Sequence, residues 1–573
     1  MKSLKTYLKP CMAMITLGLS IKALGTFLEL LLPEILSRII DVIVPSGDRD
    51  RIILWAGIMI IFSLLAWLFN VLANRNASRV AQRITQSIRH DLFDQTLYLS
   101  CQKTDEFTIP SLESRLTSDT YNVHRMVGMM QRMGIRAPII TIGGLIMTFV
   151  MEPVLALVFL AVIPFMLVLV WLRATKGVPM FRKVQQANDR MTAVVRENSQ
   201  GIRVIKALSR TENEKTRFAG VNSKLREQEL RANRVMAIIN PMMNLFLYVG
   251  MIGVIIVGAY RVNAGLSETG KILAFMSYFQ MISRSLMAVS RMFIMYSRGM
   301  ASSARIMEVL NCDTEKSWEI KEYPEGDPDY ALEFRDVTFS YLKVRDNVKH
   351  ISFKLKKGES LGIIGATGAG KSTLISLLLR FYDVDEGAIY LNGKDVRSYT
   401  PSELRRVFGV VMQNDFLFAE TVEENIRFGR EVEDPELEEA IESAQAEEFI
   451  SQLEEGVGHM LTTKGTNLSG GQRQRVLLSR AFAALPEYLL LDDSSSALDY
   501  KTDAKLRRAL AEKYPDTTMI LIAQRVSSVK NCDQIIVLEH GEVSGIGTHD
   551  ELLKNNAVYA QIADSQMGGA LFD

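Results

Sequence analysis

The sequence predicts two unlike domains, an α-helical membrane domain followed by an α/β domain. The chain has 573 residues, too many for one ordinary domain. It is 48% hydrophobic and yet 23% charged, which suggests two halves of different character rather than one average globule. Long apolar segments occupy residues 1–310, whereas short β-rich runs alternate with helical ones in residues 331–573. The polar stretch 311–330, with two prolines, is predicted to be a linker.

Six segments of the first domain are apolar enough to cross a bilayer, whose hydrocarbon core of about 30 Å needs roughly 20 helical residues. Four of them contain no charged residue, and the first and the last contain two each. A tight turn at Glu152 and Pro153 separates the third span from the fourth. The predicted spans are residues 12–33, 52–74, 137–151, 154–172, 235–260 and 272–293.

The loops between these spans predict the orientation of the chain. Residues 75–136 and 173–234 are long and rich in Lys and Arg, whereas the connections 45–51 and 152–153 are short. Because basic loops stay on the cytoplasmic side, we expect the N-terminus and both long loops in the cytoplasm. Their helical periodicity indicates that they extend the membrane helices beyond the bilayer.

Charged residues lie within the first and the sixth span. Lys22 and Glu29 belong to the first, and Arg284 and Arg291 to the sixth. A charge at membrane depth is costly and usually faces protein or water. One interpretation is that the two helices line a translocation pathway, with Lys22, Glu29 and Arg284 near the substrate. The other is structural pairing, such as an ion pair of Glu29 with a cation.

A phosphate-binding loop lies between a strand and a helix of the second domain. Residues 365–372, GATGAGKS, match G-x-x-x-x-G-K-[ST], preceded by the strand LGIIG and followed by an apolar helix. The glycines let backbone amides approach phosphates, and the helix N-terminus adds its dipole. Lys371 would reach the terminal phosphates of a nucleotide, and Ser372 would ligate Mg²⁺.

The strand YLLL ends in two adjacent carboxylates. Asp492 can hold the magnesium ion, directly or through water. Asp493 follows at the place of a group that polarises the attacking water.

A second glycine-rich turn, LSGGQ at 468–472, precedes another helix. It offers a second anion-binding surface, which one nucleotide does not need, so we expect it to face a nucleotide on another copy or on a partner. Taken alone, it would be a helix-capping turn.

The ordered set of motifs resembles that of an ABC transporter half of the exporter type, in which six membrane helices are fused to one nucleotide-binding domain. The resemblance covers essentially all 573 residues. It implies ATP and Mg²⁺ as cofactors and a multi-pass protein of the bacterial plasma membrane, with the nucleotide-binding domain in the cytoplasm. Short coupling helices are implied near 106–112 and 200–206.

The resemblance also implies a role for each motif residue. Gln413, in VVMQND, corresponds to a glutamine that serves both the catalytic site and the magnesium ion, together with Ser372 and Asp492. Asp499 closes the D-loop, SALD. The expected nucleotide-binding residues are Tyr341, which would stack on adenine, and Gly365, Thr367, Gly368, Ala369, Gly370, Lys371, Ser372 and Thr373. The signature that would complete a partner's ATP site comprises Ser469, Gly470, Gly471 and Gln472.

Three positions depart from the family pattern. Asp493 stands where the family has Glu, Gln524 where it has His, and Thr463 where an acidic residue is common. An Asp has the shorter reach, and an amide cannot become an imidazolium. Loss of a well-placed acid–base group typically costs about 10²–10⁴-fold in rate. The catalytic positions Asp493 and Gln524 therefore predict a site that binds ATP well and hydrolyses it poorly.

A weakened phosphate site beside an intact signature predicts one half of a heterodimer, similar to the degenerate-site subunit of bacterial multidrug exporters. A working homodimer that tolerates Asp493 is the alternative. The expected cargo is a small amphipathic, drug-like compound, with lipid, peptide or siderophore export as alternatives, and the expected surroundings include membrane lipid. An ATP-gated channel or regulatory subunit is a further alternative. The net charge of +1 gives no indication of a nucleic-acid partner.

Overall fold

The computed structural model describes residues 2–172, 175, 177–318, 320–494 and 496–567. These residues divide into two compact units. The helical unit comprises Met1–Leu97 and Phe107–Cys312, and the α/β unit comprises Tyr98–Glu106 and Asp313–Asp573. A short piece of the first predicted cytoplasmic loop therefore belongs to the α/β unit.

The helical unit confirms the prediction of six spans. Among the described residues, six helical stretches are long and apolar enough to cross a membrane: Leu4–Ile43, Arg49–Leu97, Ile109–Met151, Pro153–Leu172, Thr211–Asn263 and Thr269–Leu310. The helices of this part of the chain are α1 (Leu4–Leu8), η1 (Lys9–Cys11), α2 (Met12–Arg38), η2 (Ile39–Ile43), α3 (Arg49–Leu97), α4 (Cys101–Phe107), α5 (Ile109–Ser114), η3 (Arg115–Asp119), α6 (Thr120–Met133), α7 (Arg136–Pro138), η4 (Ile139–Gly143), α8 (Gly144–Met151), α9 (Pro153–Leu172), α10 (Val178–Gln200), α11 (Ile202–Ala207), α12 (Thr211–Asn263) and α13 (Thr269–Leu310).

The predicted tight turn joins α8 to α9. Glu152 is extended (φ −159°), and α9 begins at Pro153, whose fixed φ suits the first position of a helix. The Glu152 carboxylate is buried, and it forms an ion pair of 2.9 Å with Arg261 at the end of α12. The acid at the turn therefore ties the α8–α9 connection to α12.

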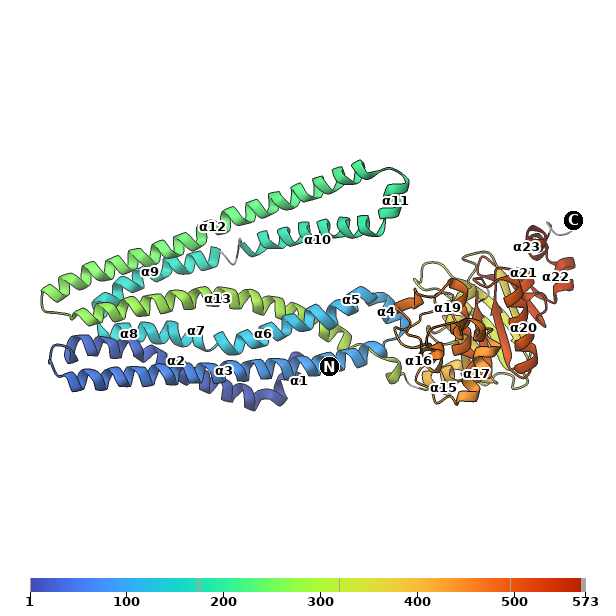
Figure 1. Cartoon of the computed structure of the whole chain (residues 1–573), viewed down its shortest axis with the longest axis horizontal. Helices are drawn as coiled ribbons and strands as arrows, with labels where there is room; N and C mark the ends of the chain where they lie inside the picture. The colour runs from blue at the N-terminus through green and yellow to red at the C-terminus, as the bar shows by residue number, and fades with distance from the viewer. Residues whose placement is uncertain (1, 173–174, 176, 319, 495, 568–573) are drawn as a thin grey trace. The chain divides into compact units, whose positions relative to one another are not determined.

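Hydrogen bonds and aromatic contacts join the membrane helices. The Tyr278 hydroxyl of α13 donates to the Leu30 carbonyl of α2 at 2.7 Å. Phe159 of α9 packs edge-on against Phe279, with ring centroids 4.5 Å apart. Figure 1 shows α10 and α12 running side by side and joined through α11. Short helices thus occur in both predicted coupling regions, as α4 and α5 near residues 106–112 and α11 near 200–206.

The α/β unit contains two sheets. A four-stranded antiparallel sheet has the order β2-β1-β4-β5, and a six-stranded sheet has the order β10-β9-β3-β8-β7-β6. The strands are β1 (Leu332–Phe339), β2 (Val348–Leu355), β3 (Ser360–Gly365), β4 (Glu386–Leu391), β5 (Lys394–Asp395), β6 (Phe408–Val411), β7 (Tyr488–Asp492), β8 (Thr518–Ile522), β9 (Gln534–Glu539) and β10 (Glu542–Gly547). The helices are η6 (Glu315–Ser317), α14 (Lys371–Leu378), η7 (Val396–Ser398), α15 (Pro401–Arg406), α16 (Val422–Arg427), α17 (Asp434–Ser443), α18 (Glu447–Ile450), η8 (Gly456–Gly458), η9 (Thr463–Gly465), α19 (Gly470–Phe482), α20 (Tyr500–Lys513), α21 (Val526–Val529), α22 (His549–Asn555) and α23 (Ala557–Met567).

Five strands of the larger sheet, β9, β3, β8, β7 and β6, are parallel, and β10 pairs antiparallel at the edge. The central strands are buried on both faces, so they are almost continuously apolar. Because parallel strands end at one edge of the sheet, the residues that follow β3, β6, β7 and β8 gather there.

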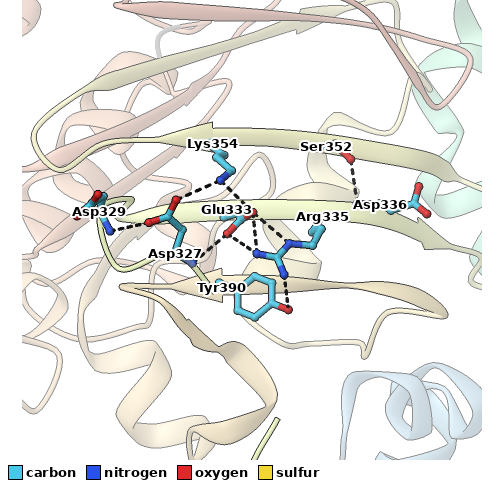
Figure 2. Close-up of polar contacts among 8 residues, drawn as sticks. All are labelled: Asp327, Asp329, Glu333, Arg335, Asp336, Ser352, Lys354 and Tyr390. Atoms are coloured by element: carbon cyan, nitrogen blue, oxygen red, sulfur yellow. Dashed lines mark hydrogen bonds and ion pairs between the residues drawn. The ribbon is translucent and has the colours of Figure 1, made fainter. Parts of the chain in front are cut away.

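A buried carboxylate joins the strands of the smaller sheet (Figure 2). Glu333 is 3% exposed. Both of its oxygens accept hydrogen bonds of 3.0 Å from Arg335 Nη2, and Lys354 Nζ lies 3.5 Å away. Arg335 also donates to the Tyr390 hydroxyl (3.4 Å), and Lys354 to Asp327 (3.4 Å). A buried charge needs such partners, and here they connect β1, β2 and β4 to the segment before β1.

The segment predicted as a linker packs on the α/β unit. Glu315 forms ion-paired hydrogen bonds of 2.7 and 3.0 Å with Arg405. The Trp318 ring lies under the Arg380 guanidinium, 4.6 Å from its centroid. The Lys321 carbonyl accepts from Ser398 (3.0 Å). These contacts give the segment a fixed course over the unit.

Candidate functional site

Four neighbouring strands deliver the predicted catalytic groups to one edge of the larger sheet. The phosphate loop follows β3, and Gln413 follows β6 by two residues. Asp492 ends β7, where it pairs with Ile522 of β8, and Gln524 follows β8 by two residues. The sheet order therefore places side chains far apart in the sequence around one pocket.

That pocket has a volume of about 220 Å³. It collects most of the residues predicted for the phosphates and the metal ion. Gly365 and Ala369 shape the loop without lining the pocket, because Gly365 lies against the Leu538 carbonyl and Ala369 is buried. The lining residues are Asn347, Thr367, Gly368, Gly370, Lys371, Ser372, Thr373, Gln413, Asp492, Asp493, Ile522 and Gln524.

The phosphate loop is built for an anion. Gly368 (φ +84°) and Gly370 (φ +97°) adopt left-handed backbone conformations that favour glycine. A Cβ at Gly370 would lie 2.7 Å from the Asn347 carbonyl oxygen, so a side chain has no room there. No side chain caps the N-terminus of α14. The amides of its first two residues, Lys371 and Ser372, are therefore available to phosphate oxygens, whereas that of Thr373 donates to the Gly370 carbonyl (3.1 Å).

Lys371 is folded onto its own loop. Its Nζ donates to the Gly365 carbonyl (2.8 Å) and to the Ala366 carbonyl (2.9 Å). Burial lowers the pKa of Lys371, and the carboxylates of Asp492 and Asp493 oppose this shift. The ammonium is thus held at the pocket by weak neutral acceptors, which a phosphate can replace.

Asp492 has the setting of a metal ligand. It is 4% exposed at the end of β7. Burial raises the pKa of Asp492, and a hydrogen bond from Ser372 opposes this shift. Ser372, Gln413 and Asp492 line the same pocket and offer oxygen donors, the chemistry that Mg²⁺ prefers. These three side chains fit a magnesium ion bound beside the phosphates.

Asp493 and Gln524 touch each other. Gln524 Nε2 donates to Asp493 Oδ2 at 3.1 Å. Asp493 has φ +52°, and its backbone amide donates to the Ile522 carbonyl (2.9 Å). Burial raises the pKa of Asp493, and the cations of Lys371 and Arg525 oppose this shift. The two catalytic positions that depart from the family pattern thus form one contact at the mouth of the pocket.

A residue of the last helix holds the backbone around Gln524 in place. Gln566 of α23 donates from Nε2 to the Gln524 carbonyl (2.8 Å) and accepts from the Val526 amide (2.8 Å). No motif identifies Gln566, which lies some forty residues further along the chain. Its role depends on the packing of the last helix.

Tyr341 lies outside the phosphate pocket, in a neighbouring hollow of about 340 Å³. Its ring meets those of Phe339 and Tyr382 edge-on, with centroids 4.9 Å away in each case. The Tyr341 amide donates to the Asn347 side chain (3.1 Å), and Asn347 lines the phosphate pocket. Asn347 therefore links the predicted adenine platform to the phosphates, which the sequence motifs did not indicate.

Tyr382 is a second aromatic residue that the motifs missed. Its hydroxyl donates to Asp105 at 2.5 Å. Burial and this hydrogen bond raise the pKa of Tyr382. Asp105 belongs to Tyr98–Glu106, just before the predicted coupling region 106–112. The available signal was the FYD sequence that follows the phosphate-loop helix.

The signature turn lies apart from the phosphate pocket of its own chain. Among the described residues, none from Ser469 to Gln472 lines that pocket. Ser469 caps α19 by accepting from the Gln472 amide (3.3 Å), and Gln472 accepts from the Ser469 amide (2.9 Å). In this structure the turn therefore serves as a helix cap, the simpler of the two interpretations of its sequence. Thr463 begins η9, a separate exposed turn upstream.

The D-loop packs against the signature. A Cβ on Gly471 would lie 3.1 Å from the Ala497 carbonyl oxygen, so glycine permits the close approach. Asp499 caps α20 and accepts from the Thr502 amide (2.9 Å) and hydroxyl (2.8 Å). These hydrogen bonds lower the pKa of Asp499.

The predicted pathway residues of the first span have partners within the helical unit. Lys22 is 4% exposed, and its Nζ donates to Asn70 (2.7 Å) and Asn74 (3.1 Å) of α3. Glu29 forms an ion pair of 2.8 Å with Arg136. This pair is the structural arrangement that the sequence left open for Glu29. Arg284 differs, because its side chain is exposed on α13.

Comparison with known proteins agrees with this arrangement. Residues 15–286 match the family model described as the ABC transporter transmembrane region, and residues 348–496 match the one described as ABC transporter. The chain is 33% identical over 572 residues to the uncharacterised ABC transporter ATP-binding protein YfiB of Bacillus subtilis, covering 99% of both chains. It is 30% identical to the ATP-dependent lipid A-core flippase of Vibrio cholerae, covering 86% of this chain and 84% of the flippase.

The fold also matches a solved structure of a bacterial Atm1-family ABC exporter with ATP bound. The TM-score is 0.80 at 22% identity, with 98% of each chain covered. Relatives over the full length and six apolar helices joined to a phosphate-loop domain lead to one conclusion. The chain belongs to the ABC transporter family, as an exporter-type half-transporter that crosses the membrane several times and whose cytoplasmic domain couples ATP hydrolysis to transport.

Proposed function

We propose that this chain is the degenerate-site subunit of a heterodimeric exporter, which retains ATP at its own phosphate loop and hydrolyses it slowly. The contact between Gln524 and Asp493 supports this proposal most directly. A group that polarises water needs the right geometry before it needs the right pKa. Here the carboxylate is shorter by a methylene and already accepts a hydrogen bond from an amide.

Gln524 cannot replace a histidine in the reaction. Its amide can donate one hydrogen bond to a phosphate oxygen, but it carries no proton that it can release and no charge that it can acquire. The Gln524 Nε2 group has two N–H donors, and one of them already donates to Asp493. One donor would therefore remain for a γ-phosphate oxygen.

The rest of the pocket is equipped to bind ATP. Lys371 would exchange the Gly365 and Ala366 carbonyls for phosphate oxygens, and the uncapped α14 would add its amides. Ser372, Gln413 and Asp492 would hold Mg²⁺, which neutralises phosphate charge. Tyr341 would stack on the adenine. Binding and hydrolysis thus depend on different residues, and only the second set departs from the family pattern.

The exposed signature turn supports a partner. Ser469, Gly470, Gly471 and Gln472 lie at the start of α19, away from the chain's own pocket. We propose that they complete the ATP site of a different half-transporter that supplies a glutamate. The pair would then hydrolyse ATP at the partner's phosphate loop.

A homodimer with slow activity is the second candidate. One observation favours it, because burial raises the pKa of Asp493 and makes its carboxylate a better base than an exposed aspartate. Two such sites would form between two copies of this chain. The turnover of the chain alone distinguishes the two candidates.

We propose small amphipathic compounds as the cargo, moved from the cytoplasm or the inner leaflet. The spans are strongly apolar, while α2 and α13 carry polar groups at membrane depth. Arg284 is the pathway candidate among the three predicted residues, since Lys22 and Glu29 are engaged by neighbours. Lipid export is the alternative, supported by the relative named as a lipid A-core flippase.

The test is the steady-state ATPase rate of the purified full chain in lipid nanodiscs, with ATP binding measured in the same sample. We expect saturable ATP binding with very slow turnover. The Asp493→Asn variant provides the background rate. Fast turnover from the chain alone, abolished by Asp493→Asn, would contradict the heterodimer and make Asp493 a working catalytic residue.

A further inference from the structure

Four arginines of α13, Arg284, Arg291, Arg298 and Arg305, follow one another at intervals of seven residues. Arg305 forms an ion pair with Asp119, whereas the three before it form none among the described residues. In a helix with 3.6 residues per turn, seven residues fall about 20° short of two full turns, so the three side chains leave nearly the same face. All three residues are exposed. We call them the arginine stripe.

The arginine stripe has no acidic partner within the described residues. In that part of the chain, no carboxylate lies at ion-pair distance from any of its guanidinium groups. Arg136 shows the contrast, since its guanidinium forms an ion pair of 2.8 Å with Glu29. Of the two acids of α2, Glu29 is therefore engaged elsewhere, and Glu34 forms no ion pair with the stripe among the described residues.

In a second copy of this chain, the two most apolar spans could not supply acidic partners for the arginine stripe. Residues 153–172 and 235–260 contain no charged side chain. Arginine at membrane depth is unfavourable against hydrocarbon and usually faces protein or water. Arg284 lies within the predicted span 272–293 and Arg291 near its end, so these two are expected to face protein, water or a ligand rather than lipid chains, whereas Arg298 lies beyond the span.

A cavity of about 350 Å³ opens beside the stripe, between α6 and α13. Met295, which lies between Arg291 and Arg298 in the sequence, forms its α13 wall. On the α6 side the cavity is lined by two further cations, Arg125 and Arg132. Its charged groups are thus all of one sign, with only a histidine besides them.

One of these cations has unused hydrogen-bonding capacity. Arg132 Nη2 donates to Ser78 at 3.0 Å, but its Nε is buried and has no partner among the described residues. A buried donor without an acceptor is unfavourable, and an anionic oxygen would satisfy it. Met129, Met133 and Met295 supply adaptable apolar surface to the same cavity.

We infer that the cargo is an amphiphile with an anionic head group, a phosphate, sulfonate or carboxylate, bound by the arginine stripe and Arg132 with its apolar part against the methionines. Guanidinium groups recognise such oxyanions through paired, charge-assisted hydrogen bonds. The same positive charge disfavours lipophilic cations. This inference rests on the proposed export function and narrows its cargo class.

The test uses three probes with one fluorophore and one dodecyl chain, ending in a phosphate, a hydroxyl or a trimethylammonium group. Fluorescence anisotropy measures their binding to the full chain in phosphatidylcholine nanodiscs, with empty discs subtracted. Since hydrogen bonds to charged groups differ from neutral ones by about one factor of ten in affinity, we expect the phosphate probe to bind about tenfold or more tightly than the other two. Equal binding of the phosphate and hydroxyl probes would overturn the inference.

The double variant Arg291→Gln with Arg298→Gln should remove this preference and leave the hydroxyl probe unchanged. The corresponding Lys variant should keep most of it, because the charge is retained. Arg226→Gln, an exposed position on the cytoplasmic part of α12, is the matched control and should behave as the wild type. An unchanged phosphate preference in the Gln variant would overturn the inference.

Discs containing phosphatidylglycerol distinguish two sources of the anionic head. Competition by this lipid would identify a bilayer lipid as the ligand, whereas unchanged probe binding would identify a soluble amphiphile.

An uptake assay in inverted vesicles tests the inferred cargo class separately from the export function. ATP-dependent uptake of all three probes without preference would overturn the anionic class and keep export. Anionic preference in binding without uptake in the presence of a partner would keep the site and contradict export.

Discussion

Two glycine-rich turns of the α/β unit each precede a helix, and the N-termini of the two helices differ in how they are capped. The phosphate loop reaches α14 through Gly370, in the left-handed conformation, and no side chain caps the helix. The signature turn reaches α19 through Ser469, and a reciprocal capping box occupies the turn. Free amides favour an external anion, whereas a capped turn is stable without one. The first turn is thus prepared for an anion within this chain, whereas the second is complete without one.

The largest expected effect is on the catalytic contact beside the first turn. Asp493→Glu combined with Gln524→His restores the reach of the carboxylate and an ionisable ring, so turnover at this site should rise about 10²-fold. The measurement is steady-state ATPase of the full chain in nanodiscs. Asp516→Glu adds the same methylene on an exposed loop and serves as the control. No gain in turnover would show that Asp493 and Gln524 are not what limits hydrolysis.

The next effect concerns ATP binding. Lys371→Met removes the ammonium that would contact the phosphates, and loss of charge-assisted hydrogen bonds of about 1.5–3 kcal/mol should weaken ATP binding roughly 10–100-fold. Lys357→Met, at an exposed position, should leave the affinity unchanged. Equilibrium binding of a fluorescent ATP analogue measures both variants. If Ser469→Ala weakened this binding as strongly as Lys371→Met, the contrast between the two turns would be wrong.

A smaller effect concerns pH, because the carboxylates of Asp493 at the phosphate site and Asp499 near the signature turn have pKa values shifted in opposite directions. Burial raises the pKa of Asp493, so its charged form is lost at a higher pH than that of an ordinary aspartate as the pH falls. Hydrogen bonds from Thr502 lower the pKa of Asp499, so its charge persists to lower pH. Residual turnover should therefore decline on acidification as Asp493 is protonated, while Asp499 keeps its charge, and Asp493→Asn should abolish this decline. Identical pH profiles for the wild type and Asp493→Asn would exclude Asp493 as the titrating group.

The smallest effect tests the capping box. Ser469→Ala should lower the stability of the chain by about 1 kcal/mol, because α19 loses its N-cap acceptor. Thermal unfolding followed by intrinsic fluorescence in nanodiscs reports the shift, with exposed Ser402→Ala as the control. A shift no larger than that of Ser402→Ala would mean that the hydrogen bond between Ser469 and Gln472 does not stabilise the turn.

Local patterns in the sequence were sufficient for the fold class and for most of the phosphate site. Apolar length alone predicts the six spans, because a hydrocarbon core leaves few other ways to place them. The turn at Glu152 and Pro153 follows from one dipeptide. The phosphate-loop motif identified Lys371 and Ser372, the end of an apolar strand identified Asp492 and Asp493, and the resemblance to the family identified Gln413 and Gln524. All six line one pocket.

Contacts between distant segments depended on the tertiary structure. The sequence separates Asp493 from Gln524 by thirty-one positions, and only the pairing of β7 with β8 brings the two side chains together. Asn347, Tyr382 with Asp105, and Gln566 carry no motif. The same holds in the membrane domain, where Asn70, Asn74 and Arg136 provide the partners of Lys22 and Glu29. Periodicity reports which face of an element is apolar, whereas the identity of a polar group's partner is set by packing across the whole fold.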